Sequence, residues 1–258
     1  MPDNDSKPAP ATTDDWPVFV ISLTDAHARR AEVTRQLDAL GIPFTFVDAV
    51  DGRKSLPAEY EHLVDRPGTR ALLFRAMADA EYATALSHMS VYRRVLDDGL
   101  PGAVILEDDV ILNEAFADFL SQRGYLHADL VRLDHMRARV WRNAKSVATI
   151  GESKLVPIAW AGWLATGYAI NRKAAEHILQ HAIPVRCPVD WPDCVDVLDS
   201  VLAQPMIVGR PTPTLDQSHA EASRNQMIEQ RQKWRGRRFL RRAYWRRKVR
   251  GLLSRPAV

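Results

Sequence analysis

Three consecutive carboxylates, Glu107, Asp108 and Asp109, are the residues of this sequence best suited to chemistry. They follow directly on the apolar run 103–106, which is typical of a β-strand buried on both faces. Adjacent carboxylates repel one another, and a divalent cation is the simplest compensation. Oxygen ligands favour Mg²⁺ or Mn²⁺, which in proteins commonly also hold phosphate oxygens. The triplet therefore indicates a metal–phosphate site, and a solvated acidic turn is the alternative interpretation.

The side-chain directions within the triplet depend on where the strand ends. If the strand continues, Glu107 and Asp109 share one face and Asp108 points away, because side chains alternate along a strand. A turn directly after Leu106 would weaken that expectation. In open α/β sheets, ligands bind at the carboxyl ends of the strands, which is where the triplet lies.

The segments around the triplet alternate between strand and helix patterns. Residues 18–22 and 44–48 are β-rich runs joined by a helical stretch over 26–40, which predicts a parallel strand–helix–strand unit. Residues 51–76 are typical of a loop with short helical pieces. Further helices are expected over 81–96, 113–122, 172–181 and 195–202, and further strands over 103–106, 129–134, 167–171 and 206–208. The order predicts an α/β fold with a mostly parallel sheet flanked by helices.

The charge of the 258-residue chain is divided unequally along its length. Lys and Arg number 35 and Asp and Glu 32, for a formal net charge of +3. Residues 231–258 hold 12 basic and no acidic residues, so residues 1–230 hold 23 basic and 32 acidic residues and a net charge of −9. We therefore expect an acidic body with a basic tail. The hydrophobic content of 46% is sufficient for a substantial core and excludes disorder of the whole chain.

The sequence contains no pattern of a secretory or transmembrane segment. No apolar run approaches the roughly 20 residues that span a bilayer. The polar, proline-rich N-terminus favours a disordered leader over residues 1–16 of a cytoplasmic protein. Cys187 and Cys194 are expected to be free thiols, because two cysteines cannot build a disulfide framework.

Several segments resemble, in order, the motifs of glycosyltransferase family 25, which includes galactosyltransferases that build bacterial lipopolysaccharide and lipooligosaccharide cores. The resemblance covers roughly residues 17–225. The segment 104–110, which contains the carboxylate triplet, is its most specific part. The other matching segments are residues 18–30, 41–52, 86–88, 167–174, 188–190 and 216–218. Each segment alone is weakly informative, whereas the ordered set is specific.

The resemblance implies a GT-A-like fold, a nucleotide-sugar donor and a divalent metal held by a DxD-type motif. The expected donor is UDP-galactose and the expected metal is Mn²⁺, or Mg²⁺. By this resemblance Asp109 is the main metal ligand, Glu107 holds the metal or the donor ribose, and Asp108 belongs to the donor site. A metal here would act as a Lewis acid and offset the charge on the leaving diphosphate.

The N-terminal motif implies further donor-site residues, Leu23, Arg29 and Arg30. An arginine can pair with phosphate bidentately. Either arginine alone is better explained as a surface residue of an amphipathic helix, whereas the pair favours the donor site. Ser22 stands where many relatives carry Asn, which affects at most a local hydrogen bond.

Four other residues are expected near the nucleotide. Asp48 and Asp51 flank the carboxyl end of the second strand. Ser87 and His88 match the family on the helix that precedes the acidic strand. A structural role is the alternative for His88, because a lone histidine on a helix is more often a satisfied packing group than a ligand.

Inverting sugar transfer requires a base that deprotonates the acceptor hydroxyl, normally a carboxylate. Asp190 is the first candidate, and Asp193 and Asp196 are alternatives. These acids could instead cap the following helix. His219 could add a metal ligand or be a plain loop histidine.

Three tryptophans, Trp160, Trp163 and Trp191, surround the motifs of the second half. Aromatic faces can stack on sugars, so these residues could form an acceptor wall, with core packing as the alternative.

The tail carries an apolar stripe at helical spacing, formed by Trp245, Val249, Leu252 and Leu253. A basic helix with aromatic residues can lie on an anionic membrane or bind nucleic acid, and a solvated tail is a third interpretation. Because the family's acceptors are lipid-linked, we favour membrane association through residues 231–255.

These observations lead to one functional prediction. Residues 17–228 form the catalytic domain and 229–258 a basic amphipathic tail. The protein is expected to be a metal-dependent, inverting galactosyltransferase that extends a lipopolysaccharide or other cell-surface glycan at the inner face of the membrane. A nucleic-acid-binding protein and an inactive, sugar-binding family member are the alternatives, and the intact triplet argues against the second.

Overall fold

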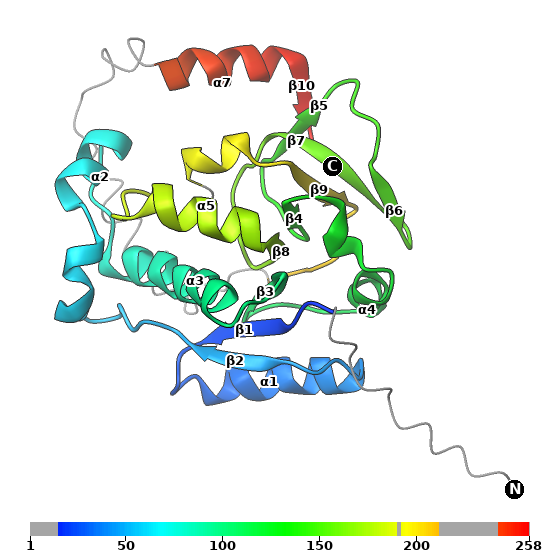
Figure 1. Ribbon diagram of the computed structural model, residues 1–258, viewed down its shortest axis with the longest axis horizontal. Coiled ribbons are helices and arrows are strands. Elements are labelled where there is room, and N and C mark those ends of the chain that lie inside the picture. The colour runs from blue at the N-terminus through cyan, green and yellow to red at the C-terminus, as the bar shows by residue number, and fades with distance from the viewer. Residues whose placement is uncertain (1–14, 190–191, 212–241, 258) are drawn as a thin grey trace, which may run out of the picture.

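The computed structural model describes residues 15–189, 192–211 and 242–257 (Figure 1). Within them, ten strands form one mixed sheet with helices on both faces. The strands are β1 (Val18–Ser22), β2 (Thr45–Asp48), β3 (Gly102–Glu107), β4 (Leu130–Arg132), β5 (Arg139–Trp141), β6 (Ala148–Ile150), β7 (Ser153–Trp160), β8 (Gly167–Asn171), β9 (Ser200–Gln204) and β10 (Ser254–Pro256). The helices are α1 (His27–Ala39), α2 (Arg66–Leu73), α3 (Asp79–Asp97), α4 (Glu114–Ser121), α5 (Arg172–Ala182) and α7 (Arg242–Leu253), with 3₁₀ turns η1 (Ala58–Leu63), η2 (Gly124–His127) and η3 (Asp193–Val197).

The first strand–helix–strand unit forms as the sequence predicts. β1 runs parallel to β2 and, on its other side, parallel to β3. Between them α1 ends at Ala39, and Gly41 takes a positive φ of 66°, a conformation that glycine adopts without steric cost. The three strands therefore end at the same edge of the sheet, which places Ser22, Asp48 and Glu107 side by side.

The central strands are buried on both faces, which explains their uninterrupted apolar sequence. Phe19 and Ile105 pack in the core beneath α3 and α5. Val20 and Leu106 point to the opposite face, where α1 and α4 cover them. Because both faces of β1 and β3 are fixed in this way, the carboxyl ends of these strands form a rigid support for the residues that follow.

The sheet is mixed, which corrects the expectation of a mostly parallel one, while the α/β class is confirmed. The strand order is β10-β5-β7-β9-β4-β8-β3-β1-β2, with β6 paired to β7. Only β1–β2, β1–β3 and β4–β9 are parallel pairs among the described strands. Parallel pairs require a long crossover, whereas β5, β6 and β7 are joined by short connections and therefore pair antiparallel.

Two expected elements differ from those in the structure. The helix predicted over 195–202 is wrong, because residues 193–197 form η3 and residues 200–204 form β9. The run Val201-Leu202-Ala203 is fully buried between β4 and β7, so tertiary packing selects a strand there. The strand predicted over 206–208 is also wrong, since this segment forms bends that lead to an isolated bridge between Gly209 and Ile111.

The C-terminal residues contribute to the sheet. β10 pairs antiparallel with β5, and α7 lies along the outside of the molecule next to this edge (Figure 1). The Arg139 guanidinium donates hydrogen bonds to Ser254 Oγ at 2.8 Å and to the carbonyl oxygens of Ser254 and Gly251. Among the described residues, no helix combines the length and the apolar character needed to cross a membrane.

Candidate active site

The carboxylate triplet lies at the end of β3, and its three side chains have different neighbours. The strand ends at Glu107, and Asp108 and Asp109 occupy a turn. The alternation expected for a continuing strand therefore does not apply. Each carboxylate contacts a different set of neighbours, and these neighbours define what each can do.

Asp108 is bound by the N-terminal motif. Ser22 Oγ donates a hydrogen bond of 2.6 Å to Asp108 Oδ2, and Arg29 Nη1 lies 3.2 Å from Asp108 Oδ1. The Asp108 side chain is only 9% exposed, while that of Arg29 is 51% exposed. The buried carboxylate thus holds the guanidinium of a half-exposed side chain.

Arg30 binds the ends of β1 and β2 together. Its Nη2 contacts Asp48 Oδ1 at 2.5 Å and the Ser22 carbonyl oxygen at 3.0 Å, and its Nε donates to the Leu23 carbonyl oxygen at 3.0 Å. The guanidinium also lies over the Phe46 ring, 4.6 Å from the centroid. The structure therefore brings Leu23, Arg29, Arg30 and Asp48 into one network with Asp108.

Glu107 faces α3 rather than the arginine network. His88 Nε2 lies 3.2 Å from Glu107 Oε1, and His88 Nδ1 lies 2.7 Å from the Tyr168 hydroxyl. The Tyr168 hydroxyl continues to Tyr92 at 2.6 Å. Burial lowers the pKa of His88 to about 3, so the ring is neutral near pH 7 and can donate from one nitrogen only.

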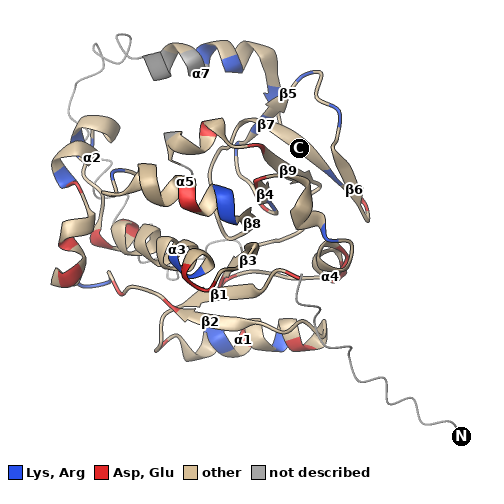
Figure 2. Ribbon diagram, viewed as in Figure 1, with Lys and Arg blue, Asp and Glu red and all other residues tan. Residues whose placement is uncertain are grey.

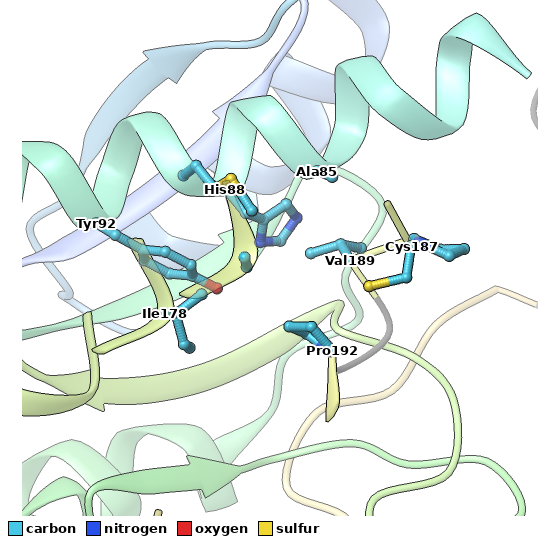
Figure 3. Close-up of a pocket in the computed structure, with 10 residues that line it drawn as sticks. Ala85, His88, Tyr92, Ile178, Cys187, Val189 and Pro192 are labelled. Atoms are coloured by element: carbon cyan, nitrogen blue, oxygen red, sulfur yellow. The ribbon is translucent and has the colours of Figure 1, made fainter. Parts of the chain in front are cut away.

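His88 also borders a narrow pocket between α3 and α5. Figure 3 shows the imidazole of His88 and the phenol of Tyr92 on one side, with Cys187 and Val189 opposite them. The side chains that line the pocket are mostly apolar. Tyr92 and Tyr168 were not among the site residues predicted from the sequence. Their burial raises the pKa of both hydroxyls.

Ser87 does not join its neighbour in the site. Its Oγ donates to the Ala83 carbonyl oxygen at 2.7 Å and accepts a hydrogen bond of 2.9 Å from the Val50 backbone N–H. Ser87 therefore ties α3 to the loop after β2 and has a structural role. Asp51, in the same loop, is bound by the Arg53 side chain, whose hydrogen bonds lower the pKa of Asp51 to about 2.

Asp109 is the carboxylate with an unused oxygen. Its Oδ1 is buried and has no hydrogen-bond partner among the described residues. Burial raises the pKa of Asp109, Arg210 and Arg29 oppose that change, and Asp108 adds to it. An unpaired buried carboxylate oxygen is costly and is the kind of group that a bound cation satisfies.

The residues present fit a divalent ion that takes part of its coordination from a substrate. In the described part of the chain, no three His, Cys, Asp or Glu side chains converge as a preformed cage. Mg²⁺ and similar ions are commonly held by one or two carboxylates together with substrate phosphates. Asp109, with Glu107 at the preceding strand end, matches that mode of binding.

The same edge of the sheet holds a buried polar cluster that the sequence analysis missed. Arg132 ends β4, and Asp134 and His135 follow it. All three are at most 9% exposed. Burial raises the pKa of Asp134 and lowers that of His135. The signal was available, because Asp134 follows an apolar strand as Glu107 does, but no motif marked it.

Several sequence-derived candidates lie outside the described residues. They are Asp190, Trp191, His219, the segment 216–218 and the part of the tail before residue 242. The alternative base Asp196 is described, and it forms an ion pair of 2.6 Å with Arg250 of α7. Of the three tryptophans, Trp163 is exposed and Trp160 is half-buried.

The protein has an α/β sheet, and carboxylates and arginines gather where adjoining strands end. This arrangement is consistent with a GT-A-like fold whose sheet is mixed. Comparisons with known sequences give the particular family. Residues 15–192 match the sequence model of "Glycosyltransferase family 25 (LPS biosynthesis protein)". The chain therefore belongs to glycosyltransferase family 25.

Three relatives illustrate the similarity. Lacto-N-neotetraose biosynthesis glycosyltransferase LgtB of Neisseria meningitidis is 34% identical over 183 residues, which cover 67% of this chain and 64% of that protein. Lipooligosaccharide biosynthesis protein lic2B of Haemophilus influenzae is 28% identical, over 63% of this chain and 62% of that protein. Procollagen galactosyltransferase 1 of Danio rerio is 29% identical, over 67% of this chain and 30% of that protein. The matches thus span less than two thirds of these relatives.

Proposed function

We propose that this protein is a metal-dependent glycosyltransferase that moves galactose from UDP-galactose onto a lipopolysaccharide or other cell-surface glycan, with inversion at the anomeric carbon. Family membership supports sugar transfer, and the names of relatives that act in lipooligosaccharide or collagen glycosylation support the acceptor class and galactose. The observation that carries the proposal is the buried, unpartnered oxygen of Asp109 beside the arginine network at the ends of β1–β3.

In this proposal Asp109 and Glu107 hold Mn²⁺ or Mg²⁺. The ion, when bound, supplies Lewis-acid stabilisation of the negative charge on the departing diphosphate. Arg29 binds a donor phosphate, because its guanidinium is half exposed and is oriented by the buried Asp108. Arg30, Leu23 and Asp48 keep the ends of β1 and β2 in place, and the exposed Asp48 carboxylate lies where a nucleoside could contact it.

The base in this proposal is Asp190, which deprotonates the acceptor hydroxyl on the face opposite the leaving diphosphate. The ion pair of Asp196 with Arg250 supports the choice, because the Arg250 guanidinium already occupies that carboxylate. Asp193 remains the second alternative. Neutral His88 orients Glu107 by donating from Nε2, while the Tyr168 hydroxyl donates to Nδ1.

The experiment is a screen of nucleotide sugars with Mn²⁺, followed by nucleotide release with and without glycan acceptors. We expect UDP-galactose to be the preferred donor and Asp109→Asn to lower the rate by at least about a hundredfold. Asp38→Asn, an exposed aspartate of α1, is the matched control and should retain the wild-type rate. Absence of binding and turnover for every donor would refute the enzyme proposal. Metal-dependent turnover by Asp109→Asn would refute only the ligand assignment.

We also propose that the protein works at the cytoplasmic face of an anionic membrane, through residues 231–255. Support comes from α7, where Trp245, Val249, Leu252 and Leu253 are each 53–75% exposed. Arg250 of the same helix pairs with Asp196, while Lys248 is exposed. Figure 2 shows basic residues along the described part of α7. An apolar stripe facing outward next to basic residues matches a helix that lies in a lipid interface.

Vesicle co-sedimentation tests this placement. Because β10 belongs to the sheet, the double substitution Trp245→Ser/Leu252→Ser is a cleaner variant than truncation at Glu229. We expect it to weaken binding to vesicles of phosphatidylglycerol and phosphatidylethanolamine at least about tenfold, whereas Val147→Ser, an exposed apolar residue on another surface, should not. Unchanged vesicle binding would refute the proposal. Tight, steeply salt-dependent binding to oligonucleotides instead would favour the nucleic-acid alternative.

A further inference from the structure

Large apolar side chains are exposed around the same sheet edge that carries Asp109. They lie in the segments that follow β3, β4 and β9 and in the segment that precedes β8, and they are Ile111, Met136, Met206 and Trp163, with exposed fractions of 38–48%. Exposed apolar groups gathered at one place are more informative than single ones, because such patches mark binding surfaces. We call these four residues the edge patch.

The segments that carry the edge patch are connected to one another by hydrogen bonds. Met136 and Trp163 exchange two backbone hydrogen bonds of 3.0 and 2.8 Å. The backbone N–H of His135 donates to Met206 Sδ at 3.4 Å. Ile111 and Gly209 exchange backbone hydrogen bonds of 2.8 and 2.9 Å. The four segments therefore form one surface.

Trp163 is held in place from below by a buried arginine. Arg132 is fully buried, and its Nη2 donates to the carbonyl oxygens of Trp163 and Leu164 at 2.7 and 2.8 Å. Burying a guanidinium costs desolvation free energy, and here the guanidinium binds the backbone under an exposed indole. That cost indicates that the position of the indole is important.

The backbone around Trp163 is also strained. Leu164 has a φ of 80°, in the left-handed region that non-glycine residues rarely adopt. Gly162 has a φ of 73°, and a Cβ there would lie 2.5 Å from the Met136 carbonyl oxygen, so only glycine fits. Strain of this kind persists where the surrounding structure enforces it, and it is concentrated at functional sites.

The edge patch is continuous with the candidate active site. Three residues after Trp163, the Thr166 carbonyl oxygen accepts a hydrogen bond of 2.8 Å from the Glu107 backbone N–H. On the other side, Ile111 follows Asp109 by two residues. The exposed indole thus shares its supporting backbone with the carboxylates to which the metal ion is assigned.

We propose that the edge patch is the acceptor subsite and that a sugar ring of the acceptor glycan stacks on Trp163, with Arg132 as the residue that positions the indole. The apolar face of a pyranose matches an aromatic ring, and Arg137, whose guanidinium lies over the Trp163 ring at 4.8 Å from its centroid, supplies hydrogen-bond donors for sugar hydroxyls beside the indole. This inference rests on the proposed function, because it assigns the second substrate of the same reaction.

The test separates the acceptor step from the donor step. Purified wild-type protein and Trp163→Ala are assayed for hydrolysis of UDP-galactose without acceptor and for transfer to methyl β-glycosides of glucose, galactose and N-acetylglucosamine. We expect Trp163→Ala to raise the KM for the preferred glycoside at least about tenfold, with unchanged donor hydrolysis. Trp163→Phe should restore most of the affinity, and Leu126→Ala, an exposed apolar residue of η2, is the matched control.

Ligand-observed NMR of the same glycosides without donor gives a readout that does not require turnover. Wild-type protein should give a saturation-transfer signal that Trp163→Ala lacks. Loss of donor hydrolysis by all variants would refute the proposed function and leave the binding result to decide the subsite. The inference is overturned if Trp163→Ala binds and transfers as the wild type does, if no glycoside binds the wild type, or if the substitution changes only self-association in sedimentation.

Discussion

At the residue scale, neighbouring carboxylates in this sequence have opposite environments. Asp108 is held by Ser22 and Arg29, whereas Asp109 has a buried oxygen that no described group satisfies. Both residues lie in the turn that follows Glu107. One carboxylate therefore orients an arginine, and the other is available for a cation.

This environment predicts that Asp109→Asn stabilises the protein while it inactivates it. Burial raises the pKa of Asp109, so the charged form is disfavoured in the folded state, and the neutral amide removes that cost. We expect the free energy of unfolding at pH 7.5, measured by urea denaturation in metal-free buffer, to rise by about 1 kcal/mol. Asp38→Asn should leave it unchanged. A clear loss of stability in Asp109→Asn would show that the carboxylate is satisfied in the folded protein.

His88 predicts a pH dependence of stability. Its folded-state pKa is about 3, below the ordinary value of 6.5, so between these values the unfolded chain binds a proton that the folded protein does not. Stability contributed by neutral His88 is fully present above pH 6.5 and is lost as the pH falls, by up to about 1.4 kcal/mol per pH unit. The groups that face the ring are Glu107 and Tyr168.

Urea denaturation at pH 7.5 and pH 5.5 measures this loss. We expect about 1 kcal/mol in the wild type and a smaller loss in His88→Gln, which cannot titrate. His27→Gln, an exposed histidine of α1, should behave like the wild type. Equal losses in wild type and His88→Gln would contradict the assignment.

The sequence predicted which residues gather at the site better than it predicted their directions. The order of strands and the family motifs were sufficient to place Leu23, Arg29, Arg30 and Asp48 beside Asp108. The turn after Glu107 and the hydrogen bonds of Ser87 to backbone were not predictable, because both depend on local geometry that many sequences share. Whether Asp190 is the base remains a prediction.

At the element scale, sequence patterns predicted the long helices and failed for the short strands. α1, α3 and α5 were predicted to within three residues at each end. β5 and β6, each of three residues, and β7, which contains Pro157, gave no pattern. In 195–204, an apolar run next to Asp199 fits either a helix or a buried strand, and only pairing with β4 and β7 decides between them.

The buried end of β4 predicts a large effect of one substitution. Arg132→Met removes the hydrogen bonds to the Trp163 and Leu164 carbonyls and leaves Asp134 without the positive charge that opposes its raised pKa. We expect a loss of about 3–5 kcal/mol in the free energy of unfolding. The double variant Arg132→Met/Asp134→Asn should recover part of it, and additive effects of the two substitutions would show that the residues are not coupled.

At the scale of the whole molecule, the acidic and the basic parts of the chain contribute different elements to the fold. The acidic body forms the sheet and the candidate site, while the described part of the basic segment forms α7 and then adds β10 to the far edge of that sheet (Figure 1). The sequence predicted the helix and its apolar stripe. It gave no sign of β10, because three residues that include Pro256 have no strand pattern of their own.

The docking of this segment predicts that its orientation controls membrane binding. Arg139 is half-buried, and its side chain makes three hydrogen bonds to residues 251–254. Among the described residues, the exposed Arg142 side chain donates one hydrogen bond of 3.3 Å, to the Leu252 carbonyl oxygen. Arg139→Ala therefore releases α7 from β5, and Arg142→Ala loosens it much less.

The outward direction of the apolar stripe depends on this docking. We therefore expect Arg139→Ala to speed tryptic cleavage within residues 242–255 about tenfold and to weaken vesicle binding. If cleavage accelerates while vesicle binding is unchanged, the tail binds lipid without the support of the sheet; if neither changes, Arg139 does not hold the segment.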